Sequence, residues 1–163
     1  MNKFAPKICL IYGLQGSGKT TVSYKLYSHF NKKGLKKIKI IDGDDFRKKI
    51  KNFRYDEKSR KLVGQKKYKY ILSFYKKNFF VITSSVTGHP FIKVKDSNIR
   101  IFKVLLTCSE KIRIKRLNLR KNILLSNIKK YKIKYNKKDY DIKISTSIKN
   151  LDETLKKILK FFT

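Results

Sequence analysis

The stretch that decides the fold is Gly13-Leu14-Gln15-Gly16-Ser17-Gly18-Lys19-Thr20. Before it, Ile8 to Tyr12 is a continuous apolar run, typical of a strand buried on both faces. After it, Val22, Leu26 and Phe30 recur four residues apart as the stripe of a helix, which Gly34 ends. The sequence therefore predicts a strand, a glycine-rich loop and a helix in that order.

This loop matches the phosphate-binding pattern G-x-x-x-x-G-K-[ST] at every fixed position. Its glycines let backbone N–H groups curl around a phosphate, and the following helix adds positive potential at its N-terminus. We expect Lys19 to reach the β and γ phosphates of ATP and the Thr20 hydroxyl to bind Mg²⁺, with Thr21 completing the ATP site. The alternative is a chance glycine-rich turn, but strand, loop and helix all stand in the order that phosphate binding needs.

Strands and helices alternate along the rest of the chain. Further strands are predicted at Lys37 to Ile41, Phe79 to Thr83, Ile101 to Leu106 and Ile142 to Ser145. Further helices are predicted from Asp56 to about Lys77, from Ser109 through Leu117 and from Leu151 to Phe162. In the first of these, the expected apolar side consists of Leu62, Ile71, Leu72 and Tyr75.

Such alternation requires a parallel sheet covered by helices on both faces. The predicted fold is a three-layer α/β fold of the P-loop NTPase kinase type. We expect one domain over residues 1–163, since this length suits one core. The lysine-rich stretch at about residues 118–139, interleaved with tyrosines, is predicted to form a small helical lid.

A second group of polar residues, Asp42-Gly43-Asp44-Asp45, follows the predicted strand at residues 37–41. The carboxyl edge of a parallel sheet is where α/β proteins gather ligands. Here Asp42 or Asp44 could accept the proton of an attacking hydroxyl, or help to hold Mg²⁺ through water. Asp-Gly is also a common turn pair. Because the chain has only 11 acidic residues, a cluster of three favours function.

The net charge is +32, from 43 basic and 11 acidic residues. Such a charge first suggests a nucleic-acid-binding protein. However, the lysines are spread along the whole chain, which favours a compositional bias together with an anionic small-molecule substrate. We therefore expect an anionic small molecule as substrate and no specific nucleic-acid partner.

The loop and the aspartate segment together resemble the adenylylsulfate (APS) kinase family of P-loop kinases. Members have a G-L-[SQ]-G-[AS]-G-K-[ST] loop and a D-G-D-N-x-R segment, and this chain has G-L-Q-G-S-G-K-T and D-G-D-D-F-R. Tyr55 to Arg60 resembles the family's aromatic-then-D-R segment, and Asp141 to Leu159 resembles its last strand and helix. The loop is generic to P-loop proteins, so the other segments narrow the resemblance.

The resemblance implies transfer of the γ-phosphoryl group of ATP to the ribose 3′-hydroxyl of a small nucleotide. Asp44 would be the base, Arg47 and Arg60 would bind the anionic part of the acceptor, and Tyr55 would stack on its base. Arg116 would lie near ATP, at the start of the lid. For Arg60 and Arg116 the alternative is a solvated helix face.

Departures from the family pattern fall on the acceptor and lid side. Asp45 replaces Asn, residues 62–66 replace E-N-x-R-R, residues 87–90 replace I-S-P, and residues 117–120 replace the R-D-P-K-G-L-Y continuation. A changed acceptor explains these differences economically. One branch resembling the family phosphorylates cytidine diphosphoramidate, a precursor of capsule phosphoramidate groups, and we favour this acceptor over adenylylsulfate. A nucleoside or shikimate-type kinase and a nucleic-acid-binding P-loop protein are weaker alternatives.

The lid tyrosines Tyr131 and Tyr135 are candidates for a second stacking face, or they pack the lid itself. His89, which precedes a proline, is interpreted as a loop residue. No apolar run approaches the roughly 18 residues needed to cross a membrane, so a cytoplasmic protein without a membrane partner is expected. Cys9 and Cys108 suggest neither a disulfide framework nor a metal cage. A homodimer is the candidate assembly, which the sequence leaves open.

Overall fold

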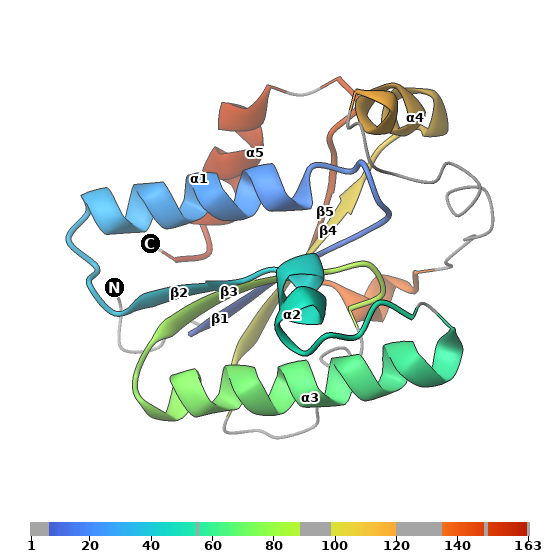
Figure 1. The fold of residues 1–163 in the computed structure, drawn as a ribbon. Coiled ribbons are helices and arrows are strands. Elements are labelled where there is room, and N and C mark those ends of the chain that lie inside the picture. The colour runs from blue at the N-terminus through green and yellow to red at the C-terminus, as the bar shows by residue number, and fades with distance from the viewer. Residues whose placement is uncertain (1–6, 55, 89–98, 120–134, 149, 163) are drawn as a thin grey trace.

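A parallel sheet of five strands, in the order β2-β3-β1-β4-β5, forms the centre of the described part of the molecule (Figure 1). The computed structural model describes residues 7–54, 56–88, 99–119, 135–148 and 150–162. The strands are β1 (Ile8–Tyr12), β2 (Ile38–Ile41), β3 (Phe80–Ser85), β4 (Ile101–Thr107) and β5 (Ile142–Ser145). Strand pairing is parallel throughout these residues, as the alternation of strands and helices predicted.

Helices cover both faces of this sheet. They are α1 (Lys19–Lys32), α2 (Gly43–Lys49), α3 (Glu57–Lys76), α4 (Glu110–Asn118) and α5 (Leu151–Leu159), with a short 3₁₀ helix at Lys137–Asp139. Figure 1 shows α1 and α5 on one side of the sheet and α3 on the other. The predicted three-layer α/β fold is confirmed. None of the helices in the described ranges is both long and apolar enough to cross a membrane.

Strand β1 is buried on both faces because its side chains alternate between two cores. Cys9 and Ile11 pack with the buried side chains of α1 and α5, whereas Ile8, Leu10 and Tyr12 pack with those of α2 and α3. All five side chains are fully buried. Each fully buried apolar side chain contributes about 1.5–3 kcal/mol relative to exposure, so this central strand fixes the loop that follows it.

The loop after β1 lies at the point where the order of strands in the sheet reverses. β1 lies between β3 and β4 and connects onward to β2, near one edge, while β4 connects to β5 at the other edge. In open parallel sheets, ligands bind at the carboxyl ends of two such neighbouring strands. The topology therefore places residues 13–18 at the expected ligand site.

The buried face of α3 differs from the prediction. It consists of Ser59, Val63, Lys67 and Ile71, spaced by four residues, whereas Leu62 is 45% exposed. The prediction for Leu62 was wrong. The buried stripe includes Lys67, and a prediction based on apolar residues does not assign a lysine to the core. Most of the predicted lid, His89 and Tyr131 lie outside the described residues.

Candidate active site

The loop between β1 and α1 requires glycine for conformation and for space. Gly13, Gly16 and Gly18 have φ angles of 144°, 79° and 89°, in a region that residues with a Cβ rarely adopt. A Cβ on Gly13 would collide with the carbonyl oxygen of Leu106 in β4, and one on Gly16 would lie 2.9 Å from the carbonyl oxygen of Arg113 in α4. The loop is thus held in the tight curve that backbone amides need to surround an anion.

The start of α1 lacks the negative charge found at other helix starts of this molecule. Gly18 occupies its N-cap position without a side-chain hydrogen bond, and its first turn contains Lys19 and no acidic residue. By contrast, the side chains of Asp42, Asp56 and Asn150 cap α2, α3 and α5, and each first turn is acidic. Because a helix N-terminus carries partial positive charge, α1 presents uncompensated positive potential. This arrangement fits the phosphates of ATP.

Lys19 and Thr20 lie where the motif predicts a site for ATP and Mg²⁺. The Lys19 ammonium donates to the carbonyl oxygen of Leu14 at 3.0 Å, so its side chain folds back over the loop. The Thr20 hydroxyl donates to Asp42 Oδ2 at 3.2 Å. A hydroxyl and a carboxylate are the hard oxygen ligands that Mg²⁺ prefers, so this pair fits the ion. Thr21 is exposed in the first turn of α1.

Asp42 connects the start of α1 to the first turn of α2. Its Oδ2 also accepts a hydrogen bond from the Ser84 hydroxyl at 2.6 Å, and its Oδ1 accepts one from the backbone N–H of Asp44 at 2.9 Å. Burial raises the pKa of Asp42, but the hydrogen bonds from Ser84, Asp44 and Thr20 and the charge of Lys67 lower it, and the net shift is downward. Asp42 is therefore ionised at neutral pH.

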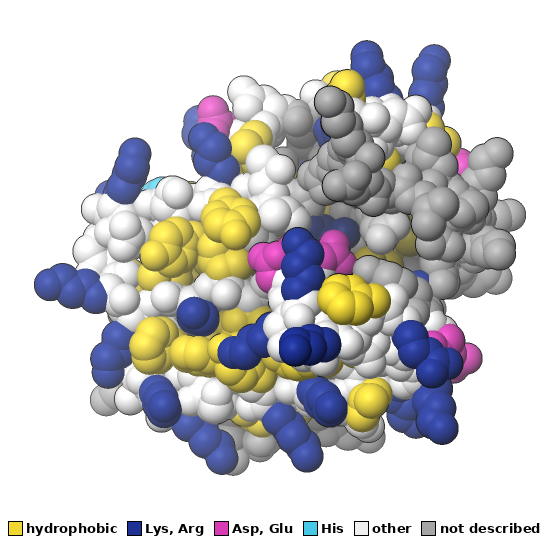
Figure 2. Space-filling view, in the orientation of Figure 1, with side chains coloured by type: hydrophobic (Ala, Val, Ile, Leu, Met, Phe, Trp, Pro, Cys, Tyr) yellow, Lys and Arg dark blue, Asp and Glu magenta, His cyan; other side chains and the backbone are white. Residues whose placement is uncertain are grey.

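Asp44 and Asp45 are exposed in the first turn of α2. In Figure 2, acidic side chains gather at the centre of the face, where Figure 1 shows α2, while most basic side chains stand around the rim. The sequence motif D-G-D-D thus places one half-buried carboxylate, Asp42, beside two exposed ones. An exposed carboxylate next to a phosphate site can accept a proton from a bound hydroxyl.

Two arginines of α4 hold the backbone of the loop. Arg116 donates from Nη1 to the Gly16 carbonyl oxygen at 3.3 Å and from Nη2 to the Thr146 carbonyl oxygen at 2.8 Å. Arg113 is buried and donates from Nη1 to the Gln15 carbonyl oxygen at 3.2 Å. Arg116 therefore lies at the glycine-rich loop, where it also donates to the Thr146 hydroxyl at 3.2 Å and to Cys108 Sγ at 3.5 Å, and its role toward ATP stays a prediction. The sequence analysis missed Arg113, which its spacing of three residues from Arg116 on one helix face could have indicated.

The predicted acceptor-binding residues lie at the junction of α2 and α3. Arg47 is buried in α2 and donates from Nη1 to the Arg54 carbonyl oxygen at 2.7 Å, which ties the connecting loop to α2. Arg60 is half-buried in the first turn of α3, and Tyr55 lies outside the described residues. Arg47 thus lies in the last turn of α2 and Arg60 near the start of α3, and their role toward an acceptor stays a prediction.

The family assignment follows from a match to a known protein family. The family described as adenylylsulphate kinase matches residues 5–112, a span that contains the loop, Asp42 and the start of α3. The chain belongs to the adenylylsulphate kinase family. It is an ATP-dependent phosphotransferase, so the resemblance seen in the sequence and the predicted class of enzyme are confirmed.

Individual relatives of this adenylylsulphate kinase family member span almost its whole length. It is 27% identical to the cytidine diphosphoramidate kinase of Campylobacter jejuni over an alignment of 165 positions that covers 95% of each chain. The structure of the Mycobacterium tuberculosis APS kinase CysC in complex with AMPPNP and APS is 16% identical, with a TM-score of 0.79 over 97% of this chain and 98% of that one. A gluconokinase from Sinorhizobium meliloti is 15% identical, with a TM-score of 0.60 over 98% and 93%. At these identities the solved structures show the shared kinase fold.

Lys67 and Ser84 are site residues that the sequence analysis missed. Lys67 in α3 is only 3% exposed, and its ammonium donates to the Ser84 carbonyl oxygen at 2.6 Å. Burial lowers the pKa of Lys67 to about 8, while the charges of Asp42 and Asp44 act to raise it. A spacing of four from Val63 was the available signal for Lys67. For Ser84 it was a polar residue following the apolar run of a strand, the position at which ligands gather.

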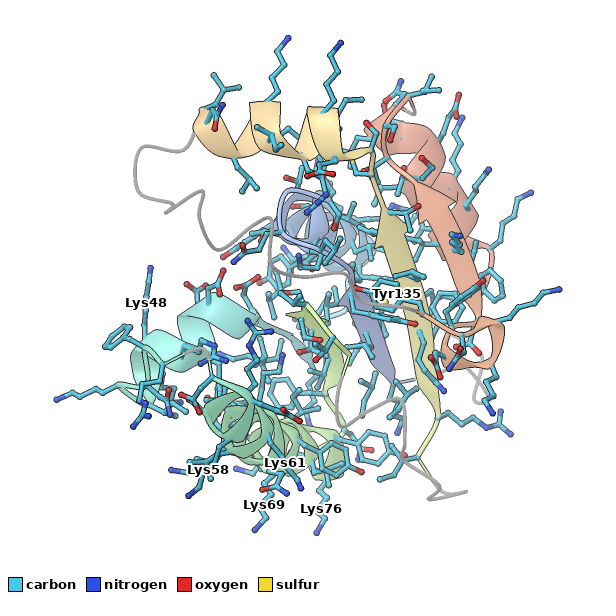
Figure 3. The ribbon with its side chains drawn as sticks, turned by 90° about the vertical axis from the view of Figure 1, so that its right-hand side faces the viewer. Lys48, Lys58, Lys61, Lys69, Lys76 and Tyr135 are labelled. Carbon is cyan, nitrogen blue, oxygen red and sulfur yellow. The ribbon has the colours of Figure 1, made fainter. Side chains whose placement is uncertain are left out.

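Tyr135 packs at the carboxyl end of β1, on the side of the sheet seen in Figure 3. Its ring lies edge-on to that of Tyr12, with 5.6 Å between centroids, and its hydroxyl donates to the Val86 carbonyl oxygen at 3.1 Å. Burial raises the pKa of Tyr135 to about 12, so the phenol is neutral at physiological pH. Of the two roles predicted for Tyr135, these contacts support packing, and stacking on a base stays untested.

Proposed function

We propose that this kinase transfers the γ-phosphoryl group of ATP to the ribose 3′-hydroxyl of a small anionic nucleotide. The observation that carries the proposal is the hydrogen bond between Thr20 and Asp42, because it joins the ATP loop to the segment after β2. Residues that fit ATP and Mg²⁺ then lie beside carboxylates that can serve a hydroxyl acceptor. Phosphoryl transfer to a hydroxyl needs such a neighbouring base.

The proposed roles follow from what each side chain already contacts. Lys19 would neutralise charge on the transferred group, and Thr20 with Asp42 would hold Mg²⁺, which would supply further positive charge for the phosphates. Both oxygens of Asp42 accept hydrogen bonds from protein donors, whereas Asp44 is exposed. We therefore propose Asp44 as the base, because its lone pairs are available to a substrate hydroxyl.

Acceptor binding is proposed for the junction of α2 and α3. Arg47 and Arg60 would bind the anionic tail of the nucleotide, since guanidinium groups form paired hydrogen bonds with phosphate oxygens. Tyr55 would stack on the base, a contact worth about 1–3 kcal/mol in nucleic-acid proteins and tolerant of base identity. Choice between bases must then come from other parts of the acceptor site.

The preferred acceptor is cytidine diphosphoramidate, and adenylylsulfate is the alternative. The preference is supported by the Campylobacter jejuni relative, which is named a cytidine diphosphoramidate kinase and matches 95% of this chain. Departures at residues 62–66 and 87–90 from the adenylylsulfate pattern support it as well. With this acceptor the product would enter synthesis of capsule phosphoramidate groups.

The test is a comparison of kcat/KM for the two nucleotides at equal, saturating Mg-ATP, with the phosphorylated position mapped on the product. We expect cytidine diphosphoramidate to be favoured and the new phosphate to lie on the 3′-oxygen. Adenylylsulfate favoured by about tenfold, or about 1.4 kcal/mol of transition-state binding, would return the enzyme to sulfate activation. Phosphate on any other position would contradict the proposed reaction itself.

The net charge of +32 is the observation that favours a second candidate, nucleic-acid binding. A steep dependence of affinity on salt would report only charge neutralisation. Sequence- or structure-selective RNA binding at physiological salt would support the second candidate. We expect weak binding without such selectivity, because the lysines are spread along the whole chain rather than grouped in one segment.

A further inference from the structure

A lysine occupies a core position of α3, directly beneath the aspartates of the site. Lys67 continues the buried stripe of Val63 and Ile71, and 3% of its surface is exposed. Burying an ammonium is costly unless it is hydrogen-bonded and balanced by opposite charge. Among the basic residues in the described ranges only Arg47, Lys67 and Arg113 are buried, and Lys67 is the one lysine of the three, so its burial calls for a function.

Lys67 begins a chain of hydrogen bonds that ends at the ATP loop. Its ammonium donates to the Ser84 carbonyl oxygen at 2.6 Å, and the Ser84 hydroxyl donates to Asp42 at 2.6 Å. Asp42 in turn accepts from the Thr20 hydroxyl and from the Asp44 backbone N–H. One buried charge is thereby connected to the proposed metal-binding residues and to the first turn that carries the proposed base.

The first turn of α2 lies close to Lys67 and Ser84. A Cβ placed on Gly43 would lie 3.1 Å from the Ser84 carbonyl oxygen and 3.8 Å from the Lys67 ammonium. The backbone N–H of Gly43 also points to the Ser84 hydroxyl oxygen, at 3.4 Å. Any shift of Lys67 or Ser84 would therefore move α2, and with it the carboxyl groups on its first turn.

The charges around Lys67 keep it protonated at neutral pH despite its burial. Asp42 and Asp44 raise its pKa, Arg47 and Lys19 lower it, and burial brings it to about 8. At pH 7 a group with this pKa is charged in about ten molecules for each neutral one. Lys67 therefore supplies a positive charge next to a cluster of aspartates.

The geometry points to Lys67 as a positioning residue for phosphoryl transfer: its ammonium, through Ser84, fixes Asp42 and the first turn of α2 relative to the ATP loop. This inference rests on the proposed kinase reaction and adds a residue to it. The Lys67 ammonium is directed to the Ser84 carbonyl oxygen within the core, so it acts on the site through Ser84. Its loss should consequently affect turnover, which depends on alignment, more than the binding of Mg-ATP.

The first experiment replaces the charge and keeps the volume. Lys67→Met should lower kcat by about 10²-fold, the cost of a misplaced reactive group, with the KM for Mg-ATP within about threefold of wild type. Its melting temperature should be unchanged or higher, because replacing a buried charge by an apolar side chain is often stabilising. The control is Lys69→Met, two residues along α3, whose side chain points away from the sheet (Figure 3) and should leave all three values unchanged.

A rescue experiment separates charge from packing. Lys67→Ala should regain about tenfold in kcat with added propylammonium, which restores the lost carbons and the ammonium, and should gain nothing from propanol. Equal rescue by propanol, which can fill the space and donate a hydrogen bond but has no charge, would show that the positive charge is not needed and would overturn the inference. So would a Lys67→Met enzyme with kcat within about threefold of wild type, or a loss confined to the KM for Mg-ATP.

A final measurement does not need the acceptor. In Lys67→Met the backbone amide of Asp44, which donates to Asp42, should exchange its hydrogen about tenfold faster than in wild type or Lys69→Met. Wild-type exchange in Lys67→Met would overturn the inference for any substrate. If the wild-type chain phosphorylates neither nucleotide, the proposed function fails while this measurement still tests Lys67.

Discussion

The starts of α1 and α2 are joined by a hydrogen bond of 3.2 Å between Thr20 and Asp42, yet they carry opposite charge. α1 begins with Lys19 and no acid, whereas α2 begins with Asp42, Asp44 and Asp45. Negative groups stabilise helix N-termini, so α2 satisfies its own N-terminus and α1 leaves that role to a ligand. The difference supports the proposal that the start of α1 receives phosphate and that the start of α2 offers carboxylates to a metal ion and a hydroxyl.

The largest effect is expected when the positive charge of Lys19 at the start of α1 is removed. Lys19→Ala should lower kcat by about 10²-fold or more with the fold intact, because such preorganised electrostatic contacts are typically worth that much in phosphoryl and acyl transfer. Steady-state kinetics and circular dichroism measure both quantities. A folded variant that keeps more than about a tenth of wild-type turnover would be incompatible with this role.

The next largest effect is expected when a carboxylate at the start of α2 is replaced. Asp44→Asn should lower kcat by about 10²-fold while ATP affinity changes little, because an amide cannot accept the hydroxyl proton. Asp45→Asn, at the neighbouring exposed position of α2, is the matched control and should stay near wild type. Equal losses in turnover and ATP binding would instead assign Asp44 to metal binding or to structure.

A smaller effect concerns stability at the junction. The pKa of Asp42 is lowered on folding, so this group adds stability at pH values above its unfolded pKa. That stability is lost as pH falls through the folded pKa, below about 4. Asp42→Asn, which can still cap α2, should lower the free energy of unfolding at pH 7 by about 2 kcal/mol and flatten its acid limb. Urea unfolding from pH 2 to 7 measures this, and an acid limb as steep as in wild type would contradict it.

The smallest effect is expected at the start of α5, a helix start that is not part of the proposed site. The Asn150 side chain accepts a hydrogen bond from the Asp152 backbone N–H and caps α5. Asn150→Ala should cost about 1 kcal/mol of stability and leave kcat and KM unchanged. Reduced turnover in this variant would mean that helix capping in general, rather than the charge at α1 and α2, controls activity.

Patterns of short range were sufficient for the fold and for the ATP loop. The run Ile8 to Tyr12, the glycines of the loop and the stripe on α1 are each readable within a few residues, and the structure places them as expected. Strand ends moved by one or two residues: β3 ends at Ser85 rather than Thr83. Because β3 is longer than predicted, Ser84 lies within the strand, and there its hydroxyl donates to Asp42.

Contacts between distant segments could not be predicted. Lys67 and Arg113 are cations in helices rich in exposed cations, and only the packing of α3 on the sheet and of α4 on the loop shows that they are buried. A pattern that counts apolar residues must place the core at Leu62 instead of Lys67. Arg47 was predicted to bind the acceptor, which stays a prediction, and its hydrogen bond to the Arg54 carbonyl depends on a loop that no motif specifies.

The hold of α4 on the loop has a consequence for how the chain can be divided. The family match ends at residue 112, yet Arg113 and Arg116 bind the carbonyls of Gln15 and Gly16, and the Thr146 hydroxyl donates to the Ser17 carbonyl. A fragment cut after the matched span would retain every letter of the glycine motif. It would lose the donors that keep the loop curved, so nucleotide binding is a property of both ends of the chain together.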